Sequence, residues 1–500
     1  MKKRMFSLFL ALTLCLGLLP VTALAAGEDA PNTLYVGNQQ VIRSSSTTYW
    51  TTDNSGGLTR VNDATDDSND WTVRYNPTNA TLTLNEAKIS GSYNEYDNPF
   101  TAGIYAKGSS NQSVALTIEL IGENTITGTF GIYVNATTPG TDASLVIKKS
   151  GDNGDNGSLT VTGTGNSGLH IISGTGDASL TIKNASVDAK TTQTYSSYAG
   201  VCVQSGASAT GSPQLSLTVN GGSLTTSGTG SSDGILFYVG SSQATGATTS
   251  LTVSENAIVD ARNGGISALN ISETLPTPTP TGNNSSGIVF DDKNGTVYGD
   301  VTLDESLTIA QGETLTIPSG SSLNANGNLT NNGTILASGG TVTGSLSDNT
   351  QVTTPTISVQ PQNKEVQEGS AAEFSVTASG AQTYQWQQST DNGGNWTNIE
   401  SATSAKYTTE ATTTSMSGYQ YRCVVKSASG VGVISQAATL TVETYTPPTT
   451  YTISADVTPV GAGTVTVNGN DTSATVVENS EVTLTATAND GYRFTGWMEN

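Results

Sequence analysis

Short apolar runs interrupt a polar sequence at regular intervals along the first half of the chain. A run with alternating apolar and polar positions predicts a strand with one buried face. One series, here called the leucine line, reads "TLTL" at 81–84, "ALTI" at 115–118, "SLVI" at 144–147, "SLTI" at 179–182, "SLTV" at 216–219 and "SLTV" at 250–253. Its leading leucines, Leu82, Leu116, Leu145, Leu180, Leu217 and Leu251, are spaced 29 to 37 residues apart.

A second series, the glycine line, follows each leucine run and reads "AGIYA", "FGIYV", "SGLHI", "AGVCV", "DGILF" and "GGISA". Between the two lies an intermediate line, with "SLTV" at 158–161, "SVDA" at 186–189 and "SLTT" at 223–226. Three short strands per repeat, joined by Gly, Asn and Ser turns, predict one coil of a parallel β-solenoid. A single coil cannot bury its apolar face, so the coils must stack on one another.

His170, the one histidine of the chain, lies in the glycine line. The first and third positions after each glycine are apolar and are predicted to face the core, because side chains alternate along a strand. The second position is mixed and is predicted to face outward as an exposed ladder: Tyr105, Tyr133, His170, Cys202, Leu236 and Ser267. This ladder is either a plain surface row or, at Tyr105, Tyr133 and His170, an aromatic stripe that stacks against sugar rings. No acid or nucleophile repeats beside His170, so a catalytic histidine is not expected.

Two segments follow directly after the repeats of residues 27–271, whose first part to about residue 70 is predicted to be a cap. Residues 272–286 form an extended Pro/Thr-rich insert. Residues 287–350 begin with "GIVF", which copies the glycine line, and continue with apolar positions every seven to ten residues. We expect tighter terminal coils that cap the solenoid, or alternatively a separate small β-domain.

Residues 356–442 contain short strands at the spacing of a β-sandwich. Trp386 lies in "YQW", and Tyr421 stands two residues before Cys423 in "SGYQYRC", the arrangement of a tyrosine corner. The segment resembles a bacterial immunoglobulin-like domain. It has no cysteine in the strand at 371–378, so Cys423 is expected to be a buried thiol outside any disulfide.

Residues 443–450 are a linker, and residues 451–500 carry "GAGTV", "VTLTATA" and "GYRFTGW". These motifs resemble the divergent internalin-type B-repeat, a small β-rich module found in arrays on surface proteins. The copy stops before the family's last strands. On this resemblance, any wall or surface-layer anchor would lie beyond Asn500.

Residues 70–345, with "TLTLNEAKISG" and "GTVYGDVTL", resemble right-handed β-helical surface proteins of the carbohydrate-binding or pectate-lyase-like kind. The resemblance implies a right-handed solenoid and a secreted protein that contacts glycans. The matched segments supply no catalytic residue.

Composition narrows the classes of partner. Residues 1–26, with "MKKR", an apolar run and "ALA", form a predicted secretory signal peptide, and no membrane insertion of the mature chain is expected. A formal charge of −22 disfavours nucleic acid and anionic lipid. The two mature cysteines, Cys202 and Cys423, lie in different predicted domains, so no disulfide is expected.

The acidic residues raise two possibilities, catalysis by paired carboxylates and calcium binding. A lyase or glycosidase needs clustered carboxylates, yet Asp188 and Asp260 fall two coils apart and Arg262 offers Asp260 an ion pair. Calcium is the one ion left open, because two oxygen-rich loops could supply ligands. Their candidate ligands are Asp66 and Asp67 in "DATDDSND", and Asp152 and Asp155 in "GDNGDNG". Solvated turns are the competing interpretation.

The sequence thus predicts an all-β protein: a parallel β-solenoid, an Ig-like sandwich and an incomplete B-repeat. We expect a secreted, cell-surface-attached, non-catalytic binding protein that needs no cofactor and recognises glycans or host or cell-wall polysaccharide. The first alternative is a purely structural surface stalk, and the second is a polysaccharide lyase or glycoside hydrolase.

Overall fold

The computed structural model describes residues 29–42, 45–66, 70–91, 93–94, 101–136, 138–151, 157–206, 212–240, 246–270, 280, 285–470 and 472–499. Over these ranges the chain is all-β, and its helical content is one 3₁₀ turn, η1 (Thr414–Met416). No helix in this part of the chain has the length and apolarity needed to cross a membrane. The predicted signal peptide and nearly all of the Pro/Thr-rich insert lie outside the described residues.

The chain divides into two compact units. The first comprises residues 1–359, 377–384 and 424–435, and the second comprises residues 360–376, 385–423 and 436–500.

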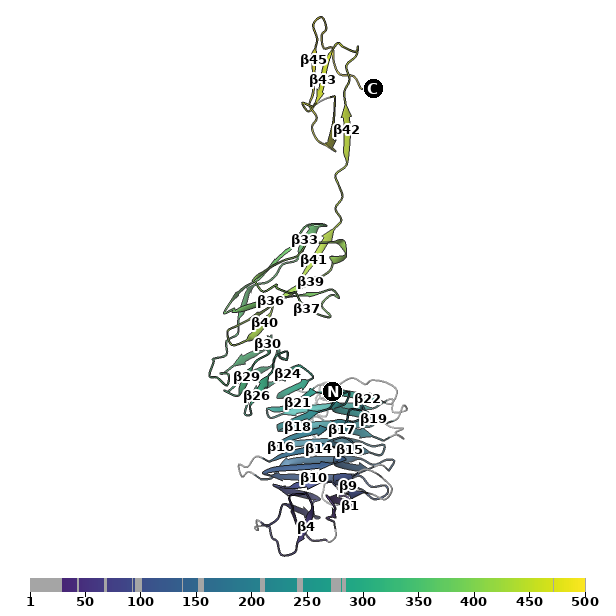
Figure 1. The fold of residues 1–500 in the computed structure, drawn as a ribbon, viewed down its shortest axis with the longest axis vertical. Coiled ribbons are helices and arrows are strands. Elements are labelled where there is room, and N and C mark those ends of the chain that lie inside the picture. Colours follow the sequence, from purple (N-terminus) through teal and green to yellow (C-terminus); the bar gives the residue numbers. More distant parts are fainter. Residues whose placement is uncertain are drawn as a thin grey trace, which may run out of the picture. The chain divides into compact units, whose positions relative to one another are not determined.

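Most of the first unit is a stack of parallel strands, here called the main stack (Figure 1). The leucine line forms β6 (Thr81–Asn85), β10 (Val114–Ile121), β13 (Ala143–Lys149) and β20 (Thr248–Ser254). The intermediate line forms β7 (Lys88–Ser90), β11 (Glu123–Gly128), β14 (Ser158–Gly163) and β21 (Ala257–Asn263). Two long strands, β16 (Ala178–Thr191) and β18 (Gln214–Ser227), run through both lines. The glycine line forms a separate sheet: β9 (Thr101–Lys107), β12 (Phe130–Ala136), β15 (Leu169–Ser173), β17 (Ala199–Ser205), β19 (Asp233–Val239) and β22 (Ile266–Asn270).

The register of the glycine line is the one that the sequence predicts. The first inward position pairs in the order Ile104, Ile132, Leu169, Val201, Ile235 and Ile266. One strand from each line together makes one coil of the main stack, which we call a rung. The strands of each rung pair in parallel with those of the next rung. The glycines permit this close stacking: a Cβ on Gly168 would lie 2.8 Å from the Gly200 carbonyl oxygen and 2.9 Å from the Lys190 nitrogen. Only glycine fits so near a neighbouring backbone.

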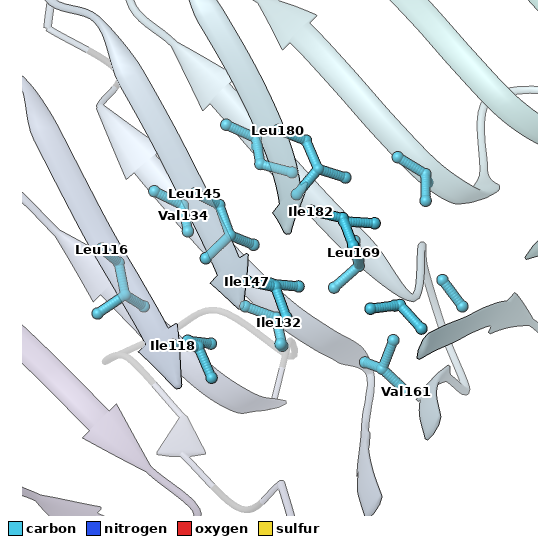
Figure 2. Packing of buried hydrophobic residues seen from close by; sticks show 14 of the residues in the cluster. Leu116, Ile118, Ile132, Val134, Leu145, Ile147, Val161, Leu169, Leu180 and Ile182 are labelled. Carbon is cyan, nitrogen blue, oxygen red and sulfur yellow. The ribbon is translucent and has the colours of Figure 1, made fainter. Parts of the chain in front are cut away.

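The leucine line agrees with prediction from its second strand onward. Leu116, Leu145, Leu180, Leu217 and Leu251 occupy one continuous row. The first strand is shifted, because Leu82 pairs with Ile118 rather than with Leu116. A shift of two residues keeps the same side chains facing inward, so the alternating pattern cannot detect it. Figure 2 shows Leu116, Leu145 and Leu180 in successive strands, with Ile132 and Leu169 of the glycine line nearby.

Antiparallel strands precede the first rung. They are β1 (Thr33–Val36), β2 (Gln39–Gln40), β3 (Thr48–Thr52), β4 (Leu58–Val61) and β5 (Val73–Asn76). A further strand, β8 (Tyr93–Asn94), lies between β7 and β9 and pairs antiparallel with β9. β1 pairs antiparallel with β9, and β5 pairs antiparallel with β6. Trp50 and Tyr75 are buried in the same core as the leucine row. These strands pair with the edge of the first rung, whose backbone N–H and C=O groups would otherwise be left unpaired.

The expectation that "GIVF" extends the glycine line is wrong. It forms β23 (Gly287–Asp291), which pairs in parallel with β21 of the intermediate line, so that Ile288 lies beside Ile258. The alternation of apolar residues is the same in every line and does not say which line a strand joins. β23 then turns back into β24 (Asn294–Tyr298), and this antiparallel pair ends the main stack.

A second stack follows, with rungs of short strands and its own buried core. Its three rows are β24, β27 (Thr314–Pro318) and β30 (Thr334–Ser338); β25 (Asp300–Thr302), β28 (Ser322–Asn324) and β31 (Thr341–Thr343); and β26 (Leu307–Ile309) with β29 (Leu329–Asn331). Also in the first unit, β32 (Thr356–Val359) pairs with β35 (Thr377–Ser379), and β40 (Val431–Ile434) pairs with β30.

The second unit holds the remaining strands. They are β33 (Lys364–Gln367), β34 (Glu373–Ser375), β37 (Thr397–Asn398), β38 (Lys406–Thr408) and β41 (Ala438–Glu443), then β42 (Thr450–Ser454), β43 (Gly463–Val467), β44 (Ser473–Val477) and β45 (Leu484–Ala488). β36 (Thr383–Ser389) and β39 (Gln420–Lys426) run across the division between the units.

The two aromatic residues noted in the predicted sandwich, Trp386 and Tyr421, are buried in the second unit. Trp386 donates its indole N–H to the Ser404 carbonyl oxygen (3.0 Å), and Tyr421 stacks on Phe374 with ring centroids 4.6 Å apart. Among the described residues the Tyr421 hydroxyl has no hydrogen-bond partner, so the hydrogen bond of a tyrosine corner is not formed there. Cys423 is a buried thiol and does not belong to a disulfide.

Candidate functional site

The predicted ladder exists, but its expected exposure is wrong. Tyr105, Tyr133, His170 and Cys202 lie side by side on successive glycine-line strands, as predicted. Tyr105 is only 3% exposed and His170 9%, while Tyr133 is half-buried. Alternation along a strand shows that these residues face away from the main core. It does not show whether a second layer covers them.

Aromatic packing accounts for part of this burial. Phe130 stacks on Tyr133 with ring centroids 4.3 Å apart and planes 9° apart. The Tyr133 ring also packs against the rings of Tyr105 and His170, with centroids 5.5 Å and 5.4 Å away. Tyr35 of β1 pairs with Tyr105 at the start of the row. The ladder is therefore a small hydrophobic layer on the outer side of the sheet, and its two buried rings, Tyr105 and His170, cannot offer a face to a ligand in this conformation.

His170 is held as a neutral side chain in this layer. Its Nε2 lies 2.9 Å from Gln204 Oε1 on the next rung, and its Nδ1 lies 3.4 Å from Asn166 Oδ1. The shorter contact favours the tautomer that carries its proton on Nε2. Burial lowers the pKa of His170 to about 4, against a smaller opposing effect of the Gln204 hydrogen bond. The residue is thus uncharged at neutral pH and packs as an aromatic ring.

This burial predicts a pH-dependent stability. Between pH 6.5, the ordinary pKa of histidine, and pH 4, the unfolded chain binds a proton at His170 that the folded chain does not. The free energy of unfolding should therefore fall as the pH is lowered through this window, by about 3 kcal/mol from His170 alone. Urea unfolding at a series of pH values measures how steeply the free energy of unfolding changes with pH.

The control is His170→Gln, which keeps a hydrogen-bonding side chain and removes the titration. This variant should lose the part of the slope between pH 6.5 and 4 that His170 causes. An identical slope in both proteins would contradict the assignment of a buried neutral histidine.

The calcium hypothesis finds no support at the one candidate ligand that the structure describes. Asp66 forms an ion pair with Arg74 (2.6 Å) and accepts a hydrogen bond from the Tyr49 hydroxyl (2.9 Å). The hydrogen bond from Arg74 lowers the pKa of Asp66 most. Asp67, Asp152 and Asp155 lie outside the described residues. No group of three or more His, Cys, Asp or Glu side chains within the described ranges is placed to hold a metal ion.

The acids weighed for catalysis are held in ion pairs. Asp188 pairs with Lys190 (2.6 Å). Glu119, a further acid on β10, pairs with Lys148 (2.9 Å). Asp188 and Asp260 occupy matching positions two rungs apart with Thr225 between them, as predicted. The predicted ion pair of Asp260 with Arg262 is also present (2.6 Å).

Arg262 makes a larger network than the sequence suggests. It also pairs with Glu313 (2.8 Å), donates to the Thr308 carbonyl oxygen (2.7 Å) and lies 4.4 Å from the centre of the Phe290 ring. The side chains of Arg262, Asp260 and Glu313 are each less than a fifth exposed. Since Asp260 belongs to the main stack and Glu313 to the second stack, the network joins the two stacks.

Turns between the intermediate and glycine lines form a surface that the sequence analysis did not single out. We call it the corner surface; it comprises the exposed and half-buried residues 164–165, 192–198 and 227–231, which contain no charged residue. Tyr195 lies on it and is 65% exposed, more than any other large apolar side chain in the described residues before Val359. The signal available in the sequence was "TYSSY", an aromatic pair in an otherwise polar turn.

Comparisons with known proteins match the C-terminal part of the chain. Residues 342–444 match the model of a domain of unknown function (DUF8696), and residues 451–500 match the model of the divergent InlB B-repeat domain, which confirms the B-repeat prediction. A solved structure of titin domains z1z2 in complex with telethonin is 23% identical and covers 24% of this chain and 72% of that chain. Its TM-score of 0.16 is too low to support an argument. No curated protein matches the chain.

Proposed function

We propose that the chain is a secreted or cell-surface binding protein without catalytic activity, and that its ligands are glycans. In this proposal the main stack is a parallel β-solenoid, right-handed as the resemblance implies, whose tighter last coils are the second stack. Residues 356–442 are an Ig-like sandwich that acts with the B-repeat module as a stalk. The B-repeat is a type of domain typical of bacterial surface proteins, which supports this location.

The observation that carries the glycan proposal is the corner surface. Three successive turns stack on one another, and hydrogen bonds link them: Gln193 Nε2 donates to the Thr164 carbonyl oxygen (2.5 Å), and Thr229 Oγ1 donates to the Gln193 carbonyl oxygen (2.6 Å). Hydroxyl and amide groups repeat there without charge. Neutral polar groups around an exposed aromatic ring suit a ligand that is rich in hydroxyl groups and has apolar faces.

Binding to a panel of soluble polysaccharides tests this proposal. The full chain should bind at least one neutral polysaccharide in affinity electrophoresis, and the binding should change little between 50 and 500 mM salt because no charge is involved. Adding calcium or a chelator should leave the binding unchanged, since the proposal requires no cofactor.

A folded full chain that binds no polysaccharide would overturn the glycan proposal. The purely structural stalk would then be favoured, because the matched B-repeat supports a surface module whether or not a ligand binds. Release of shortened or unsaturated sugar products would instead favour the lyase or hydrolase alternative.

A further inference from the structure

Hydrogen bonds from the neighbouring turn, which precedes β19, hold the loop that carries Tyr195 in place. Ser232 Oγ shares its single proton between the carbonyl oxygens of Gln193 (2.5 Å) and Tyr195 (2.9 Å). Ser231 Oγ donates to the Thr194 carbonyl oxygen (2.5 Å), and Thr229 Oγ1 donates to the Gln193 carbonyl oxygen (2.6 Å). These bonds come from side chains in the neighbouring turn and satisfy three consecutive carbonyl groups. The backbone that presents Tyr195 is therefore positioned before any ligand arrives, which lowers the entropic cost of binding.

A second tyrosine supports the exposed ring. Tyr198 meets Tyr195 edge to face, with ring centroids 6.0 Å apart and planes at 87°. The Tyr198 N–H donates to the Tyr195 carbonyl oxygen (3.1 Å), which closes the turn between them. Tyr198 is half-buried, so its ring limits the rotation of Tyr195 from one side. The Tyr195 side chain remains 65% exposed beside this contact.

We propose that Tyr195 is a stacking platform for one sugar residue of a neutral polysaccharide. The C–H groups on one face of a pyranose ring pack against an aromatic face, and the rim hydroxyls need polar neighbours. The exposed side chains of Thr194, Ser196 and Ser197 supply such neighbours. This inference rests on the proposed glycan-binding function and names the site and the class of sugar.

Two other ligand classes fit this surface less well. An anionic polymer would approach a chain of formal charge −22 through a surface that has no cation, so it would be repelled. A stable protein partner needs about 800 Å² of contact on each side. One exposed tyrosine on an otherwise polar turn does not provide the apolar centre of such an interface.

The test compares four full-length proteins: wild type, Tyr195→Ala, Tyr195→Trp and the matched control Tyr445→Ala. Tyr445 is also exposed but lies in the second unit. The probes are hydroxyethylcellulose, laminarin, dextran and xyloglucan, with polygalacturonate as the anionic probe. Tyr195→Ala should weaken binding to the neutral probe that wild type binds by about tenfold. Tyr195→Trp should retain binding, and Tyr445→Ala should match wild type.

The outcomes separate the site from the function. Wild type that binds a neutral probe, together with Tyr195→Ala that binds it equally well, would overturn this site and leave the proposed function standing. Equal losses in Tyr195→Ala and Tyr445→Ala would also overturn the site. Binding to polygalacturonate alone would overturn the neutral class of ligand. No binding to any probe by folded wild type would overturn both proposals.

Discussion

Replacing Leu180 by alanine is expected to lower the free energy of unfolding by about 2–5 kcal/mol. Leu180 is fully buried and stands in the leucine row between Leu145 on one neighbouring rung and Leu217 on the other. Removing its branched end leaves a cavity that the two neighbouring strands cannot close, because their hydrogen bonds fix the distance between rungs. Urea unfolding followed by circular dichroism measures the loss.

The matched control is Thr181→Ala, one residue along the same strand. Thr181 faces away from the core and is half-buried, so its change should alter the free energy of unfolding by no more than about 0.5 kcal/mol. Equal effects of the two substitutions would show that Leu180 does not face the core. Since a stacked array is stabilised mainly by contacts between neighbouring repeats, the Leu180 variant should unfold first around its own rung.

The second large effect is expected for Arg262→Met. This change keeps most of the side-chain volume but leaves Asp260 and Glu313 mostly buried and without their shared cation. Losing one partner of a buried ion pair costs about 3–5 kcal/mol, and we expect about 3 kcal/mol here because the network retains some exposure. The same urea experiment measures the cost.

The triple variant Arg262→Met, Asp260→Asn, Glu313→Gln provides the control. It removes the two buried charges together with their partner and should recover part of the lost stability, because the penalty comes mainly from unpaired carboxylates. If Arg262→Met were as stable as wild type, the network would not join the two stacks. A triple variant less stable than Arg262→Met would also contradict this explanation.

The alternation of side chains was sufficient to predict most of the register in the main stack. The Gly-apolar-X-apolar pattern placed Ile132, Leu169 and Val201 on one inward row, because the period of a strand is two and the glycines mark a fixed point in each rung. The same reasoning predicted that Asp188 and Asp260 lie two coils apart, and Thr225 stands between them in the structure. These predictions depended on local pattern alone.

Predictions that depended on the surroundings of a strand were less successful. The pattern cannot distinguish registers that differ by two residues, so the pairing of Leu82 was missed. It cannot assign "GIVF" to a line, because every line repeats the same alternation. It also shows nothing of what covers an outward face, so the burial of Tyr105 and His170 was not foreseen. Tyr195 was missed because it lies in a turn, where no period applies.

The shared register of the glycine line has a consequence for how such a chain can change in length. If one complete rung were deleted, Ile132 would meet Val201 where it now meets Leu169, and an inward apolar residue would still face an inward apolar residue. Loss of a single residue inside a strand would instead exchange its two faces. Insertions and deletions are therefore tolerated in whole rungs, and the height of the stack can evolve in steps of about 4.8 Å.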